Sequence, residues 1–102
     1  MLLIGQEVLE TAARKNTSLR KWLEHWAERV RRAEWMGIQD VRADYPSADG
    51  VKLRFEVVVT VFNVKGNTYR LLNAIDYESQ TVAALDVLAH AEYSKAAWKL
   101  RY

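Results

Sequence analysis

Residues 53–61 read LRFEVVVTV, and this stretch decides the fold class. Its apolar residues recur at every second position, at Leu53, Phe55, Val57, Val59 and Val61. A period of two is typical of a β-strand with one buried face. The turn sequence Lys65-Gly66-Asn67 follows, and we expect two further strands over Tyr69–Tyr77 and Thr81–Leu88. Because the connections between them are short, the three strands are expected to form an antiparallel meander.

The first half of the chain has a helical period instead. Apolar residues fall on one stripe of a predicted helix, at Leu19, Trp22, Leu23, Trp26, Val30 and Ala33. Gly37 is placed to end this helix. Shorter helices are expected near residues 8–13 and 40–45, and a last one over Ala91–Leu100, while Met1–Ile4 could add an edge strand. The sequence therefore predicts one α+β domain, residues 1–102, with helices packed on one face of an antiparallel sheet.

Composition excludes several classes of site. The 102 residues include no cysteine, which rules out a disulfide framework, a cysteine-based metal centre and a thiol nucleophile. The two histidines, His25 and His90, lie far apart in the sequence, so we expect no metal. Glycine-rich phosphate loops and the G-x-S-x-G motif are missing. No apolar run is long enough to cross a membrane, and we expect a cytoplasmic protein.

Chemistry-bearing side chains are densest between His90 and Lys95, where an imidazole, a carboxylate, a phenol and an ammonium occur within six residues. A histidine can act as acid or base near neutral pH. The structural alternative is that His90 caps the last helix and Tyr93 packs against its first turn. Similarly, Lys65 and Arg70 flank a turn and could hold a phosphate, or they could be ordinary charges of a hairpin.

The tryptophans and the basic residues of the long predicted helix have a simpler interpretation. We expect Trp22, Trp26 and Trp35 to belong to the core rather than to stack on bases. Trp98 and Tyr102 could close that core from the C-terminal end. The run Arg29–Arg32 is expected to be a solvated helix face, with a phosphate-binding surface as the alternative. A net charge of +2 is only weak support for a polyanionic partner.

Three blocks of the sequence resemble the HigB family of bacterial toxins, in the RelE-like superfamily. They are residues 28–49, residues 61–71 (VFNVKGNTYRL) and residues 90–93 (HAEY), in matching order and spacing. The resemblance implies a small twisted antiparallel sheet with helices on one side. It also implies an endoribonuclease that cuts messenger RNA on the ribosome without a metal or other cofactor. The partner would be a helix-turn-helix antitoxin of the HigA type, with DNA reached only through that antitoxin and no membrane involved.

The resemblance also implies roles for individual side chains. In the superfamily the 2′-hydroxyl next to the scissile phosphate is the nucleophile. His90 would then act as acid or base, Arg70 would clamp the phosphate and Lys65 would be an auxiliary cation. Tyr93 would stack on a base or donate a hydrogen bond, and Glu92 would orient His90 or cap the last helix. The expected RNA-binding residues are Asn67, Glu92, Lys95 and Arg54.

Some positions depart from the family pattern and leave a second function open. Ala89 stands where a threonine is frequent, Ser94 where an aspartate is frequent, and Leu85 and Asp86 where a basic residue is common. Asp86 would repel a phosphate. The alternative is therefore a RelE-like binding module with weakened or lost activity, which pairs with a helix-turn-helix antitoxin or with RNA.

Overall fold

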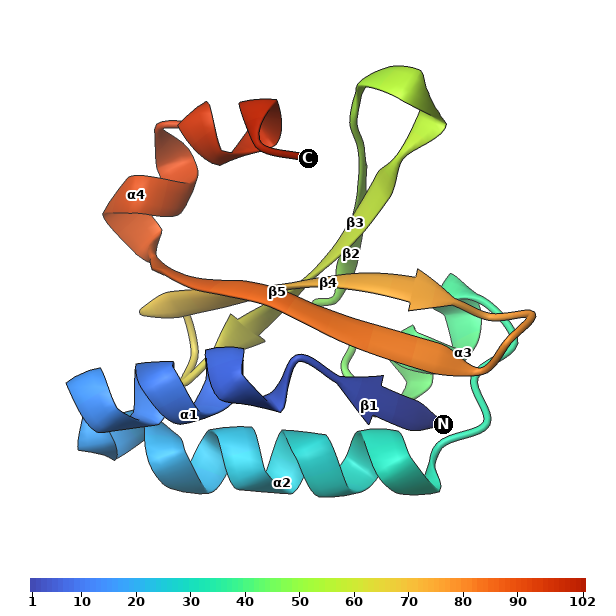
Figure 1. The fold of residues 1–102 in the computed structure, drawn as a ribbon, viewed down its shortest axis with the longest axis horizontal. Coiled ribbons are helices and arrows are strands. Elements are labelled where there is room, and N and C mark those ends of the chain that lie inside the picture. The colour runs from blue at the N-terminus through green and yellow to red at the C-terminus, as the bar shows by residue number, and fades with distance from the viewer.

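The centre of the fold is a five-stranded sheet. The structure is a computed structural model that describes residues 1–102. In chain order its strands are β1 (Leu2–Ile4), β2 (Asp49–Lys52), β3 (Val58–Val64), β4 (Tyr69–Asp76) and β5 (Thr81–Ala89), and their spatial order is β1-β5-β4-β3-β2. The predicted α+β class and the antiparallel meander from β3 to β5 are confirmed. The sheet as a whole is mixed, because β1 joins the edge of β5 in parallel (Figure 1).

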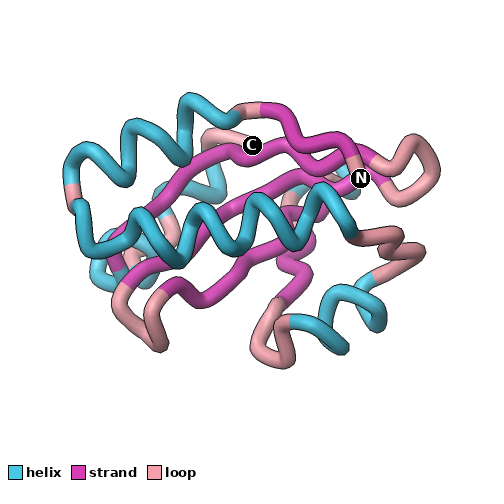
Figure 2. Tube along the Cα trace, turned by 90° about the horizontal axis from the view of Figure 1, so that it is seen from below, coloured by secondary structure: helices cyan, strands magenta, loops and turns pink.

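Two helices lie across one face of this sheet (Figure 2). They are α1 (Gln6–Lys15) and α2 (Arg20–Arg32), joined by the 3₁₀ turn η1 (Thr17–Leu19), and α3 (Ile38–Asp44) follows them. The prediction that Gly37 ends the long helix is wrong. The chain already leaves the helical conformation at Ala33, where ψ is 154°, and Gly37 instead immediately precedes α3.

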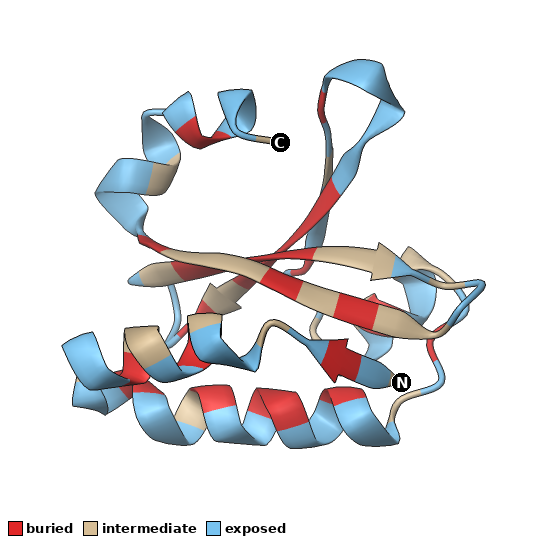
Figure 3. Cartoon of the chain, in the orientation of Figure 1, coloured by how far each residue is buried: buried red, intermediate tan, exposed pale blue.

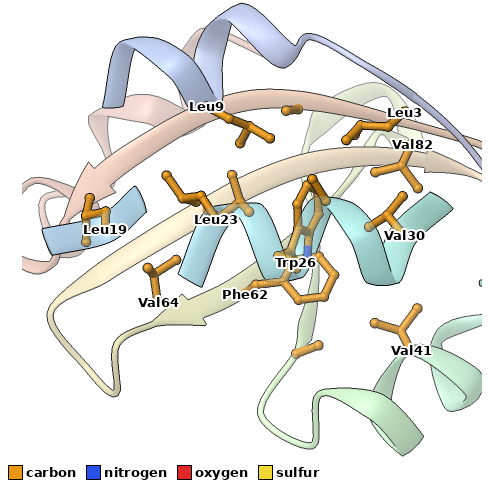
Figure 4. Packing of buried hydrophobic residues seen from close by; sticks show 14 of the residues in the cluster. Leu3, Leu9, Leu19, Leu23, Trp26, Val30, Val41, Phe62, Val64 and Val82 are labelled. Atoms are coloured by element: carbon orange, nitrogen blue, oxygen red, sulfur yellow. The ribbon is translucent and has the colours of Figure 1, made fainter. Parts of the chain in front are cut away.

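The apolar stripe of α2 forms the larger core (Figure 4). Trp26 is fully buried, and its ring lies 5.4 Å from the ring of Phe62 in an edge-to-face arrangement. Trp35 is also buried in this core, and Trp22 packs against it. The prediction that these tryptophans are core residues is confirmed. The arginines of the basic run are exposed, with Arg29 paired to Asp44 at 3.0 Å, as expected for a solvated helix face.

The opposite face of the sheet has its own, smaller core, and the C-terminal segment covers it (Figure 1). This segment comprises α4 (His90–Ser94) and the 3₁₀ turn η3 (Ala97–Leu100). Not all helices therefore lie on one face. The prediction of a single helix over Ala91–Leu100 is also wrong, because Ala96 has a left-handed backbone, with φ of 62°. The resulting bend turns Trp98 back onto the sheet, where it is buried.

The strand predicted from the opening alternation begins later than expected. Residues Arg54–Glu56 form the 3₁₀ turn η2 between β2 and β3, so that the chain reverses here. Phe55 and Glu56 have φ values of 60° and 62°, which no strand residue adopts. The alternation of apolar residues over 53–61 therefore runs through the turn between β2 and β3 instead of along one strand. The tip of this hairpin is exposed (Figure 3).

Gly5 connects β1 to α1, and we expect Gly5→Ala to destabilise the fold. Its φ is +83°, and a Cβ atom there would lie 2.5 Å from the carbonyl oxygen of Ala84 on β5. The left-handed conformation costs an L-residue roughly 1–2 kcal/mol, and the clash with backbone adds to this cost. Urea unfolding followed by circular dichroism measures the loss of free energy.

Gly66→Ala is the matched control. Gly66 also has a positive φ, of +70°, but no atom lies within 4 Å of the place that a Cβ atom would take there. We expect Gly5→Ala to lose at least twice as much stability as Gly66→Ala. Equal losses would show that the close approach of Gly5 to β5 contributes nothing.

Candidate active site

Strand register places the start of β4 beside the end of β5. Arg70 lies opposite Leu88, and Tyr69 lies opposite Ala89, the last residue of β5. The backbone N–H of His90 then donates to the carbonyl oxygen of Thr68 at 3.0 Å. Because α4 begins at His90, the imidazole is held next to the first residues of β4.

Arg70 is at the centre of this site, and its guanidinium is surrounded by acceptors. Nη1 donates to the carbonyl oxygens of Asn67 and Tyr69, both at 3.2 Å. Nη2 donates to the side-chain oxygen of Asn67 and approaches Nδ1 of His90 at 3.3 Å. Arg70 is only 8% exposed, so these hydrogen bonds offset the loss of water around its charge. The geometry fixes the guanidinium in one position.

The contact with Arg70 determines which nitrogen of His90 carries a proton. A guanidinium has donors and no acceptor, so Nδ1 of His90 must accept the hydrogen bond. In the neutral ring the proton is therefore on Nε2. The imidazole is exposed, whereas the arginine beneath it is buried. The pair thus combines a solvent-accessible titratable group with a fixed positive charge.

Tyr93 and Trp98 support this pair from the other side. The Tyr93 ring centre lies 5.4 Å from Cζ of Arg70, within cation–π range. Trp98 stacks on Tyr93 with 5.2 Å between ring centres, and its Nε1 donates to the Tyr93 carbonyl at 3.0 Å. Burial, and next the carboxylate of Asp49, raise the pKa of the Tyr93 phenol, while Arg70 lowers it. A tyrosine phenol is protonated at neutral pH even with its ordinary pKa, and this increase leaves it a hydrogen-bond donor.

The structure brings His90, Arg70, Asn67 and Tyr93 together, and the side chains of the other predicted site residues take no part in the contacts among these four. Lys65 is exposed in the β3–β4 turn, and Lys95 is exposed just after α4. Glu92 pairs with Arg101 at 3.7 Å rather than with His90. Arg54 belongs to the β2–β3 hairpin and donates to the Leu100 carbonyl at 3.3 Å.

Sequence reasoning missed the supporting role of Trp98. The sequence predicts that Trp98 and Tyr102 close the core that holds the other tryptophans, whereas the structure places both at the smaller core on the opposite face, with Trp98 directly behind Tyr93. The sequence does not indicate the stacking of Trp98 on Tyr93, because its pattern predicts one continuous helix over Ala91–Leu100. The left-handed residue Ala96 is what folds Trp98 back.

Comparison with known families supports the sequence resemblance. A family described as HigB_toxin, RelE-like toxic component of a toxin-antitoxin system, matches residues 19–96, which is more than half of the chain. The chain belongs to the HigB toxin family. As a HigB-family protein it is the toxin of a toxin–antitoxin system, and its partner is an antitoxin. A comparison with curated proteins gave no match.

The four departures from the HigB pattern can now be placed in the fold. Asp86 pairs with Arg101 at 3.2 Å and accepts from the Val87 N–H at 2.9 Å, so a cation partly offsets its charge. Leu85 is half-buried at an irregularity in the β4–β5 pairing. Ala89 and Ser94 are exposed at the two ends of α4. None of these four residues is a hydrogen-bond partner of the Arg70 guanidinium, whose partners are Asn67, Tyr69 and His90.

Two further features of this HigB-family chain concern metals and membranes. No cluster of three or more His, Asp or Glu side chains lies close enough together to hold a metal ion. None of the helices combines the length and the apolar character needed to cross a membrane.

Proposed function

We propose that this HigB-family toxin is an endoribonuclease that cleaves messenger RNA during translation on the ribosome. The observation that carries the proposal is the contact between Nη2 of Arg70 and Nδ1 of His90, at the surface where β4, β5 and α4 meet. A fixed guanidinium beside an accessible imidazole is what cleavage of a phosphodiester needs. No metal or other cofactor enters the proposed reaction.

The reaction begins with the 2′-hydroxyl of the RNA attacking the adjacent phosphorus. A bond forms between the 2′-oxygen and phosphorus, and the bond from phosphorus to the 5′-oxygen breaks. The products are a 2′,3′-cyclic phosphate and a free 5′-hydroxyl. The 2′-hydroxyl must lose a proton, the 5′-oxygen must gain one, and negative charge builds up on the phosphoryl oxygens between these events.

Arg70 would stabilise that negative charge. A charged phosphoryl oxygen is a stronger acceptor than a neutral imidazole nitrogen, so it can replace Nδ1 of His90 as the partner of Nη2. The remaining contacts to Asn67 and Tyr69 would hold the guanidinium in place meanwhile. Arginine suits this role because its planar group presents several donors in a fixed geometry.

The same exchange would make His90 a general base. Once Arg70 binds phosphate, Nδ1 of His90 has a free lone pair next to the substrate, and it can take the proton of the 2′-hydroxyl. The 5′-oxygen can receive its proton from solvent, because the imidazole is exposed. Tyr93, protonated at neutral pH, would donate a hydrogen bond or stack on a base. Lys65 and Lys95, both exposed, would contact the RNA backbone.

The proposed partner is a helix-turn-helix antitoxin of the HigA type, through which the complex would reach DNA. The cytoplasm is the proposed place of action, because messenger RNA and ribosomes are found there. How the antitoxin silences the toxin would depend on whether it covers His90.

Inducible expression of the chain tests the proposal. We expect growth to stop and new transcript 5′ ends to accumulate within translated regions, because each cleavage leaves one 5′-hydroxyl end. Mapping of 5′ ends before and after induction measures this directly, and an empty vector is the control. A chain that neither stops growth nor generates new ends, yet still purifies together with its antitoxin, would instead be a binding module.

A further inference from the structure

The tip of the β2–β3 hairpin presents an aromatic ring that the fold does not use. Phe55 is 86% exposed, the highest value among the large apolar side chains, and it belongs to neither core. Figure 3 shows this tip standing away from the rest of the molecule as an exposed segment. An exposed aromatic ring offers a flat apolar face on which a nucleobase can stack.

The backbone at Phe55 is also unfavourable for this residue type. Its φ and ψ are 60° and 30°, in the left-handed region, and Glu56 follows with φ of 62°. Glycine or asparagine adopts this conformation with less strain. Two hydrogen bonds close the turn, Leu53 N–H to Val57 O at 2.6 Å and Val57 N–H to Arg54 O at 3.4 Å. The turn needs no phenylalanine, so stability does not explain why one is present.

Beside Phe55 lies a cation without a carboxylate partner. Cζ of Arg54 lies 5.7 Å from the centre of the Phe55 ring. The neighbouring charges Lys52 and Glu56 pair with each other at 2.6 Å, so neither neutralises Arg54. The tip therefore combines an exposed aromatic face with an available guanidinium.

Contacts connect this tip to the Arg70–His90 site along one side of the sheet. Arg54 donates to the Leu100 carbonyl of η3, and within η3 the Lys99 ammonium lies 5.9 Å from the Trp98 ring. Trp98 in turn stacks on Tyr93, whose ring faces Arg70. Figure 1 shows the hairpin and the C-terminal segment rising from the same side of the sheet. A chain of contacts among cations and aromatic rings, which passes through the buried Trp98, thus connects the candidate active site to the hairpin tip.

We infer that Phe55 and Arg54 form a second RNA-binding site, at which a base of the single-stranded substrate stacks on Phe55 and Arg54 contacts the adjacent phosphate. This inference rests on the proposed ribonuclease function and adds a contact for a nucleotide away from the cleaved bond. Stacking on an aromatic ring accepts any base, so the site contributes affinity rather than sequence preference. The positive charge of Arg54, which no carboxylate neutralises, and the chain of contacts to the active site favour RNA over an apolar protein segment as the occupant.

Binding to RNA that cannot be cleaved tests this site separately from catalysis. The probe is a fluorescent 2′-O-methyl RNA about 12 nucleotides long, a length within the range of single-strand sites. It lacks the nucleophile, so fluorescence anisotropy with the full chain reports binding alone. We expect Phe55→Ala and Phe55→Leu to raise the Kd by about 5- to 150-fold, which corresponds to the usual contribution of one stacked base. Phe55→Trp, which keeps an aromatic face, should bind like the wild type.

Two further variants separate the contributions of ring, charge and backbone. Arg54→Ala should reduce the slope of log Kd against log salt by about 0.7, the value for one phosphate contact to a single strand. Phe55→Asn should bind as poorly as Phe55→Ala and yet melt a few degrees higher, because asparagine tolerates the left-handed backbone. Met36→Ala, at a side chain 75% exposed outside this path, is the control and should change nothing.

Cleavage of unmodified RNA by the wild type is measured in parallel. If the wild type cleaves RNA but Phe55→Ala binds the probe normally, the second site is refuted and the proposed function stands. If the wild type neither binds nor cleaves RNA, both are refuted. If Phe55→Ala loses only the capture of the co-expressed antitoxin, the tip is a protein contact and the inference is again refuted.

Discussion

His90→Ala should lower the rate of RNA cleavage by about 10²- to 10⁴-fold, the usual contribution of a general acid or base. The free energy of unfolding should fall by only about 0.5–1.5 kcal/mol, the usual net contribution of one hydrogen bond. Nη2 of Arg70 loses its contact to Nδ1 but keeps the one to Asn67, and the contact to Thr68 is made by the backbone N–H, which alanine keeps. Single-turnover cleavage of a short RNA measures the rate, and urea unfolding measures the stability.

His25→Ala is the matched control for this variant. His25 is the only other histidine, and it is exposed on α2, the helix that covers the opposite face of the sheet from α4. It should cleave RNA at the wild-type rate. A His90→Ala protein that cleaves as fast as His25→Ala would remove His90 from the mechanism.

The elements that could be predicted from the sequence are those with a regular hydrophobic period. The stripe of α2 arises because this helix buries one face, so that apolar residues recur at each helical turn. β3 is buried on both faces, with Val59 and Val61 in the smaller core and Phe62 and Val64 in the larger one, and the period of two follows the first pair. The pairing of β3 with β4 and of β4 with β5 followed from short connections. These elements also carry the larger core, which explains why its tryptophans could be assigned correctly.

Two of the errors fall where the chain bends at residues that carry no turn signal. Phe55, Glu56 and Ala96 all have positive φ, although none is glycine or asparagine. A reader of the sequence therefore continues a strand through Phe55 and a helix through Ala96. Tertiary packing overrides the local preference at Ala96, because the bend there buries Trp98. At Phe55 no packing compensates, and this is why function is the better explanation.

The candidate site shows the same division. Strand alternation puts Arg70 on the opposite face from Tyr69 and Leu71, and the resemblance to the HigB family implies that His90 acts together with Arg70. The structure places the two side chains in contact. The separation of Glu92 from His90 could not be foreseen, because it depends on Arg101, which the bend at Ala96 brings back toward α4.

Arg70→Ala is expected to have the broadest effect, on both activity and stability. Loss of one donor that stabilises developing negative charge lowers rates by about 10²- to 10³-fold. The truncation also removes the donors to the carbonyls of Asn67 and Tyr69 beneath the site, and a lost partner at a buried polar group costs about 1–3 kcal/mol. Cleavage and urea unfolding of the same preparations measure both effects.

Arg70→Lys and Arg32→Ala show which part of the effect comes from the guanidinium itself. Lysine keeps the charge but cannot make parallel hydrogen bonds to Asn67, Tyr69 and a phosphate, so most of the activity should be lost. The side chain of Arg32 is 79% exposed and forms a surface ion pair with Glu28, which contributes at most about 1 kcal/mol to stability. Arg32→Ala should therefore leave the cleavage rate unchanged.

Chemical rescue then separates a direct role of Arg70 from a purely structural one. The Arg70→Ala protein retains a space lined by the acceptors of Asn67 and by the Tyr93 ring. Free guanidinium at millimolar concentration can occupy it, far below the concentrations that unfold proteins. Part of the lost cleavage rate should return, while urea should return none. Absence of rescue in a variant that remains folded would mean that Arg70 only supports the fold, and that the phosphate is held by other cations such as Lys65.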